Sequence, residues 1–382
     1  MDNLTHSLVG LAAAKAGLER TSPCATALCV LAANAPDGDT IVLLLAGRWP
    51  YVEHHRGLSH SIVGTLAIAI ALALLFYGGE WLYARLVRRR APRARLRGLL
   101  FASLVVSASH PLMDWTNNYG VRPLLPWDGR WFYGDLVFIL DPWLWLSIGG
   151  AAFLLTARTR TRVAAWTLLA VALTAAILFL PERAGMPYPF ASRVLWLVGI
   201  VGLVVAHRHG VARRWGASIA VAALALVVVY WGALAVMHRR ALTEAEAFAA
   251  RLADEKGESV LRVAAMPMLA DPTRWLCIAE TNRAFTRFDL SVGGDDNRDA
   301  ATRDAERFEK PEGAAAHLVE QAARDERAEI FLGFSRFAAT RVRRDCIGAT
   351  LVQFADLRFG EPGGGGRRNS FALEIPVADA DR

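Results

Sequence analysis

The sequence predicts a mostly α-helical protein, with a polytopic transmembrane domain followed by a small soluble α+β domain. Long apolar runs with almost no charge recur through residues 1–240, near the roughly 20 residues that a helix needs to cross a bilayer. The segments between these runs are rich in arginine. From residue 241 onward the apolar runs become short and mixed with charge, which is typical of a water-soluble domain. We therefore expect domains at 1–240 and 241–382.

Six apolar stretches are expected to cross the membrane. They cover residues 61–83, 98–113, 136–157, 163–180, 191–206 and 216–237. A large soluble helical core is a poor alternative, because helices of soluble proteins keep one polar face. The stretches 24–34 and 40–47 are each too short to span. We expect them to form a helix broken at 35–39, of the kind that is tolerated at membrane depth where it lines a cavity or protein.

Basic loops predict the orientation of these spans. Up to residue 240 the chain has 23 Lys and Arg against 11 Asp and Glu, and the remainder has 20 against 25. The basic excess lies in the short loops 85–97, 157–162 and 207–214, which the positive-inside rule places in the cytoplasm. This pattern indicates membrane orientation, so no nucleic-acid partner is expected. The six spans then place residues 241–382 on the periplasmic or extracellular side.

The C-terminal residues are expected to form both helices and strands. Charged, Ala-rich stretches predict helices over 242–256 and 299–325. Strand-like runs cover 259–265, 275–280, 284–292, 329–334, 347–358 and 370–377. We find no nucleophile motif or phosphate-binding loop in this part of the sequence. Cys277 and Cys346 are expected to be able to pair as a disulfide, because the predicted topology puts them in an oxidising compartment.

Two nearly identical heptapeptides carry histidines in the N-terminal domain. Residues 4–10 read LTHSLVG, and residues 58–64 read LSHSIVG. Each places a histidine, His6 or His60, directly after a Thr or Ser that can cap a helix. A lone histidine in such a position is usually a polar cap or a surface residue, so neither heptapeptide is informative by itself.

Further ionisable residues gather near the same predicted membrane face. The turn PDGD occupies 36–39, and HPLMD at 110–114 places His110 and Asp114 on one helical face. On the expected topology, three spans bring ionisable groups to their outer ends: His54, His55, His60, His110, Asp114, Asp135 and Asp141. Charged groups at membrane depth are costly and usually functional. Imidazole with carboxylate is typical of zinc, manganese or iron sites, so we expect a site for one or two divalent metal ions, zinc or manganese.

Five motifs in this order resemble the YdjM-like family of inner-membrane proteins, described as metal-dependent hydrolases and as LexA-binding. They are THS at 5–7, PDGD at 36–39, HRGLSHS at 55–61, HPLMD at 110–114 and NYG at 118–120. The resemblance covers roughly residues 1–145 and implies an inner (cytoplasmic) membrane location. It also implies that the metal ligands or their neighbours are His6, Asp37, Asp39, His55, His60, His110 and Asp114. LexA binding fits poorly with a tail outside the cytoplasm and is not carried over.

The expected function is metal-dependent hydrolysis, in which activated water attacks an ester or phosphoester of a membrane lipid or envelope component. The candidate catalytic residues are Arg56, Asp39 and Asp114. Arg56 would stabilise a developing oxyanion, with a salt bridge to Glu53 or Asp37 as the alternative. No serine or cysteine stands in a nucleophile motif, which favours hydroxide as the nucleophile. Two other classes stay open: a transporter or metal-ion carrier with the same ligands, and a scaffold protein with a structural metal.

Overall fold

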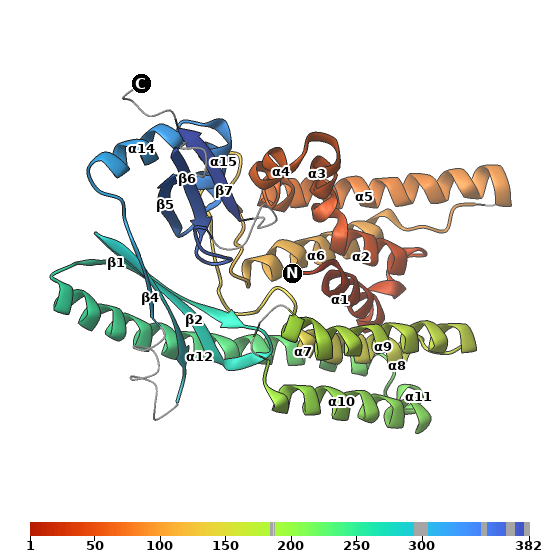
Figure 1. The fold of residues 1–382 in the computed structure, drawn as a ribbon. Helices are drawn as coiled ribbons and strands as arrows, with labels where there is room; N and C mark the ends of the chain where they lie inside the picture. The colour runs from red at the N-terminus through yellow and green to blue at the C-terminus, as the bar shows by residue number, and fades with distance from the viewer. Residues whose placement is uncertain are drawn as a thin grey trace. The chain divides into compact units, whose positions relative to one another are not determined.

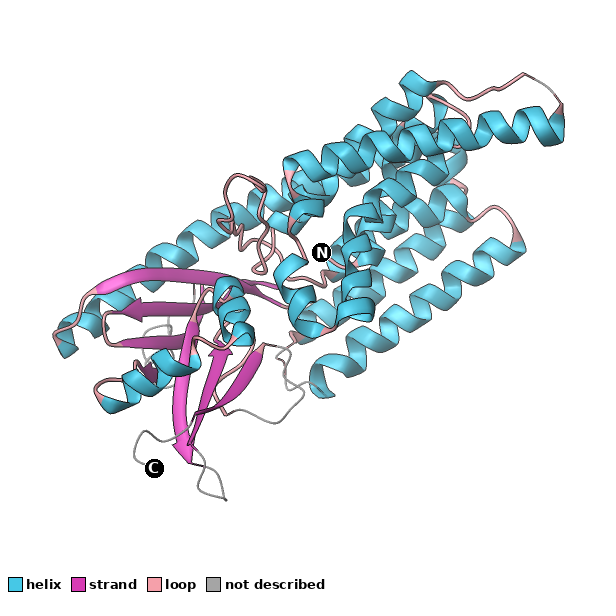
Figure 2. Cartoon of the chain, turned by 90° about the horizontal axis from the view of Figure 1, so that it is seen from above, coloured by secondary structure: helices cyan, strands magenta, loops and turns pink. Residues whose placement is uncertain are grey.

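The computed structural model describes residues 1–89, 91–183, 186, 188–293, 305–344, 350–363 and 371–377. These residues are mostly helical, and they end in a C-terminal region with two antiparallel sheets and short helices (Figures 1 and 2). The predicted fold class is confirmed. The chain divides into two compact units. One comprises Met1–Asp39, Arg56–Ala235 and Pro267–Pro272, and the other comprises Thr40–His55, Val236–Met266 and Thr273–Arg382.

Helices build the first unit. Their bounds are α1 Asn3–Ala16, α2 Ala25–Asn34, α5 Ile62–Tyr83, α6 Leu96–Trp115, α7 Pro142–Leu144, α8 Gly150–Thr156, α9 Arg160–Arg183, α10 Phe190–Arg208 and α11 Val211–Trp215. The long helix α12, Ser218–Lys256, begins here and continues into the second unit. Among the described residues, six helical segments are long and apolar enough to cross a membrane: Ala25–Ala46, Ile62–Arg88, Leu96–Trp115, Arg160–Arg183, Phe190–Arg208 and Ser218–Lys256.

Five of these six segments coincide with predicted spans, but the predicted span 136–157 is wrong in its bounds. Its helix begins at Pro142 and forms a short apolar segment, Pro142–Thr156. The reason is local, because the Asp141 side chain accepts hydrogen bonds from the backbone of Trp143 (2.8 Å) and Leu144 (3.1 Å). An aspartate at this position followed by proline is a strong helix start.

The predicted break between the two short apolar stretches is present. A 3-10 turn, Ala35–Thr40, separates α2 from α3, Ile41–Ala46. Pro36 stands at this turn, and proline has no backbone N–H to donate to a helical hydrogen bond. Together the three elements form the candidate span Ala25–Ala46, so the segment is longer than either stretch alone predicted.

The two heptapeptides begin helices in a different way from the one expected. Asp2 caps α1 by accepting from the backbone of Thr5, and Ser61 caps α5 by accepting from the backbone of Gly64. The expectation that Thr5 and Ser59 would be the caps is therefore wrong. The final glycine of each heptapeptide is required by close packing, because a Cβ at Gly10 would lie 2.6 Å from the Cys29 carbonyl oxygen, and one at Gly64 would lie 1.8 Å from the carbonyl oxygen of Leu58.

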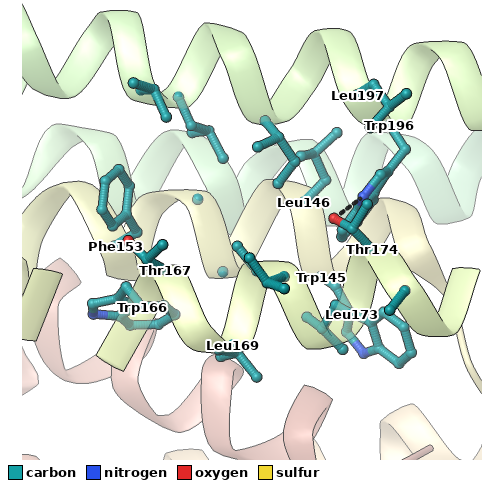
Figure 3. A pocket seen from close by; sticks show the side chains of 18 of the residues that line it. Trp145, Leu146, Phe153, Trp166, Thr167, Leu169, Leu173, Thr174, Trp196 and Leu197 are labelled. Atoms are coloured by element: carbon teal, nitrogen blue, oxygen red, sulfur yellow. Dashed lines mark hydrogen bonds between the residues drawn. The ribbon is translucent and has the colours of Figure 1, made fainter. Parts of the chain in front are cut away.

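An apolar pocket of about 490 Å³ lies among α8, α9, α10 and the π-helical turn Trp145–Gly149 (Figure 3). Two indole groups that line it have hydrogen-bond partners: Trp166 donates to Thr156 and Trp196 donates to Thr174, both at 2.9 Å. Its lining therefore presents mainly carbon, as expected between helices that face a bilayer.

The second unit contains the C-terminal sheets. Its first sheet has the order β1-β2-β3-β4 and the second has the order β5-β6-β7. The strands are β1 Val260–Met268, β2 Asp271–Thr281, β3 Ala284–Ser291, β4 Glu306–Glu309, β5 Ala338–Arg344, β6 Thr350–Asp356 and β7 Ala372–Val377. The C-terminal half of α12 packs against the first sheet, where Phe248 and Phe288 are in contact with a centroid distance of 4.5 Å.

Three expectations for this unit change. The predicted span 216–237 and the predicted helix 242–256 are one continuous helix, α12. Residues 329–334 lie in a helix, α15 Glu326–Phe334, and not in a strand. Asp325 caps α15 by accepting from the backbone of Arg327 at 2.9 Å, and acidic residues in the first turn favour a helix. Of the expected helix 299–325, the described part holds β4 and α14, Ala314–Ala322.

The segment Thr40–His55 packs with the second unit. Its helix α4, Arg48–His54, contacts α15. Trp49 packs against the cluster formed by α14, α15 and the second sheet, and the Arg48 guanidinium donates to the Ala372 carbonyl oxygen at 2.9 Å. Of the two cysteines expected to pair, Cys277 is buried in β2, and Cys346 lies outside the described residues.

Candidate metal centre

Four side chains in the first unit bring ligand atoms together: Asp37, His60, His110 and Asp114. All four atoms lie within 4.8 Å of one another. Asp37 comes from the turn after α2, and His60 ends a 3-10 turn, Leu58–His60, directly before α5. His110 and Asp114 are one turn apart on α6. The side chains of the two histidines and Asp114 are fully buried, and that of Asp37 is 9% exposed.

The spacing of these atoms matches a coordination sphere. His60 Nε2 lies 3.0 Å from His110 Nε2, 3.3 Å from Asp37 Oδ1 and 3.2 Å from Asp114 Oδ2. His110 Nε2 lies 3.4 Å from each of the same two carboxylate oxygens. Ligands bound at about 2.0–2.1 Å to a tetrahedral ion are separated by about 3.3–3.4 Å. The four residues could therefore hold one metal ion.

Hydrogen bonds on the far side of each imidazole determine which nitrogen faces the cluster. His110 Nδ1 lies 2.6 Å from the Ala33 carbonyl oxygen, which can only accept, so Nδ1 carries the proton. His60 Nδ1 lies 2.9 Å from Ser59 Oγ, and that hydroxyl donates to Asp39 at 2.8 Å. In the neutral imidazoles, both Nε2 lone pairs therefore point toward the carboxylates. This is the arrangement of metal-binding histidines oriented by outer partners.

A second feature that fits a cation is a buried hydrogen-bond acceptor without a donor. Asp114 Oδ2 accepts no hydrogen bond from any described residue, although burying a charged oxygen without a partner is costly. Its neighbours are His60 Nε2 and His110 Nε2, both of which present lone pairs. A cation among these atoms, either a metal ion or a proton on His60 Nε2, would remove the conflict. The other oxygen, Asp114 Oδ1, has its own donors, because the main-chain nitrogen of Met1 and the guanidinium of Arg56 contact it.

The electrostatics of the cluster favour a positive charge at His60. Burial lowers the pKa of His60, but the adjacent carboxylates of Asp114, Asp37 and Asp39 outweigh burial and raise the pKa to about 10. His6 behaves differently. Burial lowers the pKa of His6 to about 4, which keeps its ring neutral near pH 7. The carboxylates that attract a proton to His60 would equally attract a metal cation.

Arg56 is fixed beside the cluster by several contacts. It is 2% exposed and has a left-handed backbone, with φ of 54°, which is uncommon for a residue other than glycine. Its Nη2 lies 3.1 Å from Asp114 Oδ1, and its Nη1 donates to Asn117 Oδ1 at 3.0 Å. The guanidinium also stacks over Tyr119 at 4.6 Å. The contact with Asp114 differs from the pairing with Glu53 or Asp37 that the sequence left open.

Three predicted ligands lie outside the group of four. Asp39 Oδ2 lies 3.4 Å from His60 Nδ1, on the side of the ring that faces away from the cluster. His6 stacks on His110 with a centroid distance of 3.8 Å, and its Nε2 lies 3.4 Å from Asp114 Oδ1. His55 ends the segment assigned to the second unit and stacks on Tyr51 at 4.6 Å.

Asp135 and Asp141, which the sequence placed at the same membrane face, are not part of the group of four ligand residues. Asp141 caps α7 and accepts a hydrogen bond from the Tyr230 hydroxyl at 2.9 Å. Asp135 is buried, with a left-handed backbone (φ 51°) in the segment between α6 and α7. Neither belongs to the group of four ligand atoms.

Sequence reasoning missed Ser59, Asn117 and Tyr119. Ser59 links Asp39 to His60, while Asn117 and Tyr119 hold Arg56. Asn117 also accepts from the backbone of Tyr119 at 2.8 Å. The NYG motif at 118–120, which contains Tyr119, was the available signal, and Asn117 directly precedes it.

Comparisons with known proteins agree with the N-terminal motifs. The uncharacterized protein YfhP of Bacillus subtilis (strain 168) is 29% identical to this chain over 160 residues, which is 38% of this chain and 44% of YfhP. The chain thus matches less than half the length of that relative. No solved structure matches the chain. The profile of the YdjM inner membrane protein family matches residues 1–184, which include all four residues of the cluster. The resemblance seen in the motifs is confirmed over residues 1–184, which match the model of the YdjM inner membrane protein family.

Proposed function

We propose that this protein is a membrane-bound, metal-dependent hydrolase that cleaves an ester or phosphoester of a lipid or envelope component. The supporting observation is the buried set of four ligand atoms from Asp37, His60, His110 and Asp114. Two imidazole nitrogens with two carboxylate oxygens suit zinc or manganese better than magnesium, which prefers oxygen ligands. A bound ion would supply Lewis acidity and activated water to an ester or phosphoester.

The residues around the cluster support this chemistry. Asp39 and Ser59 position His60 through its far nitrogen, and Ala33 does the same for His110. Arg56 keeps a permanent positive charge 3.1 Å from Asp114. A fixed guanidinium at such a place can stabilise negative charge that develops on a substrate oxygen. No serine or cysteine stands in a nucleophile motif, which is consistent with water as the nucleophile.

A structural metal is the second candidate, because one observation favours it. Four protein ligands, whose imidazole nitrogens lie 3.0–3.4 Å from each other and from both carboxylate oxygens, resemble a closed structural zinc site, whereas catalytic zinc sites keep one position open. The hydrolase proposal requires that the ion accept a fifth ligand, or that one carboxylate move aside. The two candidates differ in what metal removal does. It would unfold a protein whose metal is structural, and it would inactivate a hydrolase that stays folded.

We also propose that the C-terminal region faces the non-cytoplasmic side of the inner membrane. The support is the alternation of arginine-rich loops with apolar spans. On this topology the ends of the spans that carry His60 and His110 face the same side as the C-terminal region. An enzyme needs access from that one side only, whereas a carrier needs a site reachable from both.

The test combines metal analysis with turnover. Purified wild-type protein should contain close to one zinc or manganese ion per chain and should hydrolyse a member of an ester and phosphoester panel. His110→Ala and Asp114→Asn should lose both the metal and turnover. His54→Ala is the matched control, since that side chain is 62% exposed and outside the cluster. It should keep both properties.

Three other results would replace the proposal. Loss of folding on chelation, without turnover by the metal-loaded protein, would support the structural metal. His110-dependent metal flux in proteoliposomes without turnover would support a carrier. Absence of bound metal from the folded wild-type protein, even after incubation with zinc and manganese, would exclude the hydrolase, the structural metal and the metal carrier alike.

A further inference from the structure

We propose that the substrate is a lipid whose alkyl tail lies in a groove between α5 and α6, with its head group at the metal cluster. This inference rests on the proposed hydrolase function and selects a lipid over a water-soluble envelope component. The groove has a volume of about 480 Å³ and is lined by residues of α5, α6 and the segment that follows α6.

The groove and the cluster share a residue and their two supporting helices. His60 lines the groove and also belongs to the four ligand residues. α5 begins two residues after His60 and forms one wall. The other wall is α6, which carries His110 and Asp114. On α5 the lining runs from Ile62 to Ala69, a length of about 10 Å at 1.5 Å per residue.

The walls are suited to a hydrocarbon chain. Their apolar side chains include Leu66, Leu104, Leu112 and Phe132, and Thr65 is the hydroxyl-bearing side chain among the lining residues. Both α5 and α6 belong to segments that could cross a membrane. Leu66 and Leu112 are 48% and 52% exposed, so the rim would face lipid. An occupant that reaches the cluster along this path must therefore be apolar over most of its length.

The segment after α6 holds the end of the groove near the cluster in place. The Pro123 carbonyl accepts a hydrogen bond from the backbone of Ile62 at 3.0 Å, and Val121 forms an isolated β-bridge with Phe132. Val121, Pro123 and Phe132 all line the groove. These contacts give it a preformed wall, so a tail would be positioned without first ordering a loop.

The apolar pocket among α8, α9 and α10 provides a contrast. It has a similar volume, but none of its lining residues is ionisable. A lipid chain could enter that pocket without meeting a reactive group. In the α5/α6 groove, the same chain would meet His60.

The groove is expected to position the tail more than to bind it tightly. A chain that leaves the bilayer for the groove exchanges one apolar environment for another, so little free energy is gained. Its contribution is orientation, because a tail held between α5 and α6 places the ester near the ligand atoms. Substrates with chains too short to fill the groove should therefore react more slowly.

The test uses alkyl p-nitrophenyl phosphodiesters and alkanoyl p-nitrophenyl esters of two to eight carbons, with metal-loaded protein in nanodiscs. Ala108→Trp fills the groove, since Ala108 lines it on α6. Val105→Trp is the matched control, because Val105 is 45% exposed on the same helix and does not line the groove. In Ala108→Trp, kcat/KM for the eight-carbon substrate should fall at least tenfold, while the two-carbon substrate changes less than twofold. Val105→Trp should change neither.

A binding measurement separates this inference from the hydrolase proposal. A single-chain lipid with a diazirine at its tail should label peptides within 104–115 in the metal-free wild type and in Val105→Trp, and labelling should fall in Ala108→Trp. If labelling falls in Ala108→Trp but none of the three proteins turns over any substrate, the hydrolase proposal is rejected and the groove is retained. Equal labelling in all three forms, or equal rates at all chain lengths, would overturn the groove. Ala108→Leu provides a milder change if Ala108→Trp does not fold.

Discussion

Asp39→Ala is expected to weaken metal binding without abolishing it. Asp39 Oδ2 lies 3.4 Å from His60 Nδ1 and accepts from Ser59 at 2.8 Å, and Ser59 itself is 2.9 Å from His60 Nδ1. Asp39 therefore acts on an ion held by the group of four through the orientation and basicity of His60. Loss of such an outer partner typically lowers metal affinity by about 10- to 100-fold, which corresponds to about 1.4–2.7 kcal/mol.

The measurement is a competition titration of metal-depleted protein against a chromophoric chelator, with zinc and with manganese. His110→Ala removes an atom of the ligand set and should cost more affinity than Asp39→Ala. Ser59→Ala removes the bridging hydroxyl and leaves the Asp39 carboxylate in place, so it should cost less. A thermal melt of each metal-free variant controls for changes in folding.

The order of these effects tests the assignment of Asp39. The PDGD motif placed both aspartates among the metal ligands or their neighbours, whereas the distances put Asp37 in the group of four and Asp39 behind His60. An affinity loss for Asp39→Ala as large as that for His110→Ala would make Asp39 a ligand. An unchanged affinity would refute the argument that Asp39 orients His60.

Three further predictions concern packing, topology and pH. Gly10→Ala should destabilise the detergent-solubilised protein by about 1–3 kcal/mol, because the new Cβ would lie 2.6 Å from the Cys29 carbonyl oxygen. An unchanged thermal midpoint would contradict this, because it would mean that α1 and α2 can move apart to accommodate the methyl group at no cost in stability. Alkaline phosphatase fused to the C-terminal end should be active, and an inactive fusion paired with an active cytoplasmic reporter would reverse the proposed topology. The hydrogen bond from Arg307, with its charge, lowers the pKa of Glu258 below the ordinary 4.5. This ion pair therefore stabilises the C-terminal region above about pH 4.5, and its contribution is lost as pH falls through the lowered pKa. Proteolysis should accordingly find Glu258→Gln less stable than wild type at pH 7 but equal to it near pH 2, and a difference that persists at pH 2 would exclude ionisation as its cause.

Composition and local pattern were enough to predict the helical class and most of the spans. Uncharged runs of about 20 residues have few soluble alternatives, so the segments around 61–83, 98–113, 163–180, 191–206 and 216–237 were found without tertiary information. The break at 35–39 was also predictable, because it depends on a proline without a backbone N–H and on turn-forming residues in adjacent positions. Errors arose where one short apolar run fits both a helix and a strand, as at 329–334.

The motifs predicted which residue types would form the centre, but only the tertiary structure decided their roles. His60 and His110 are 50 positions apart, and His110 meets Ala33 across 77 positions. Those approaches depend on how α2, α5 and α6 pack, which no local spacing encodes. The same packing turns the Asp37 carboxylate toward both Nε2 atoms and leaves Asp39 behind His60. The order of residues along the chain thus determined the chemistry available to the cluster, while helix packing selected which atoms meet, because a metal site is defined by separations of a few ångströms between distant segments.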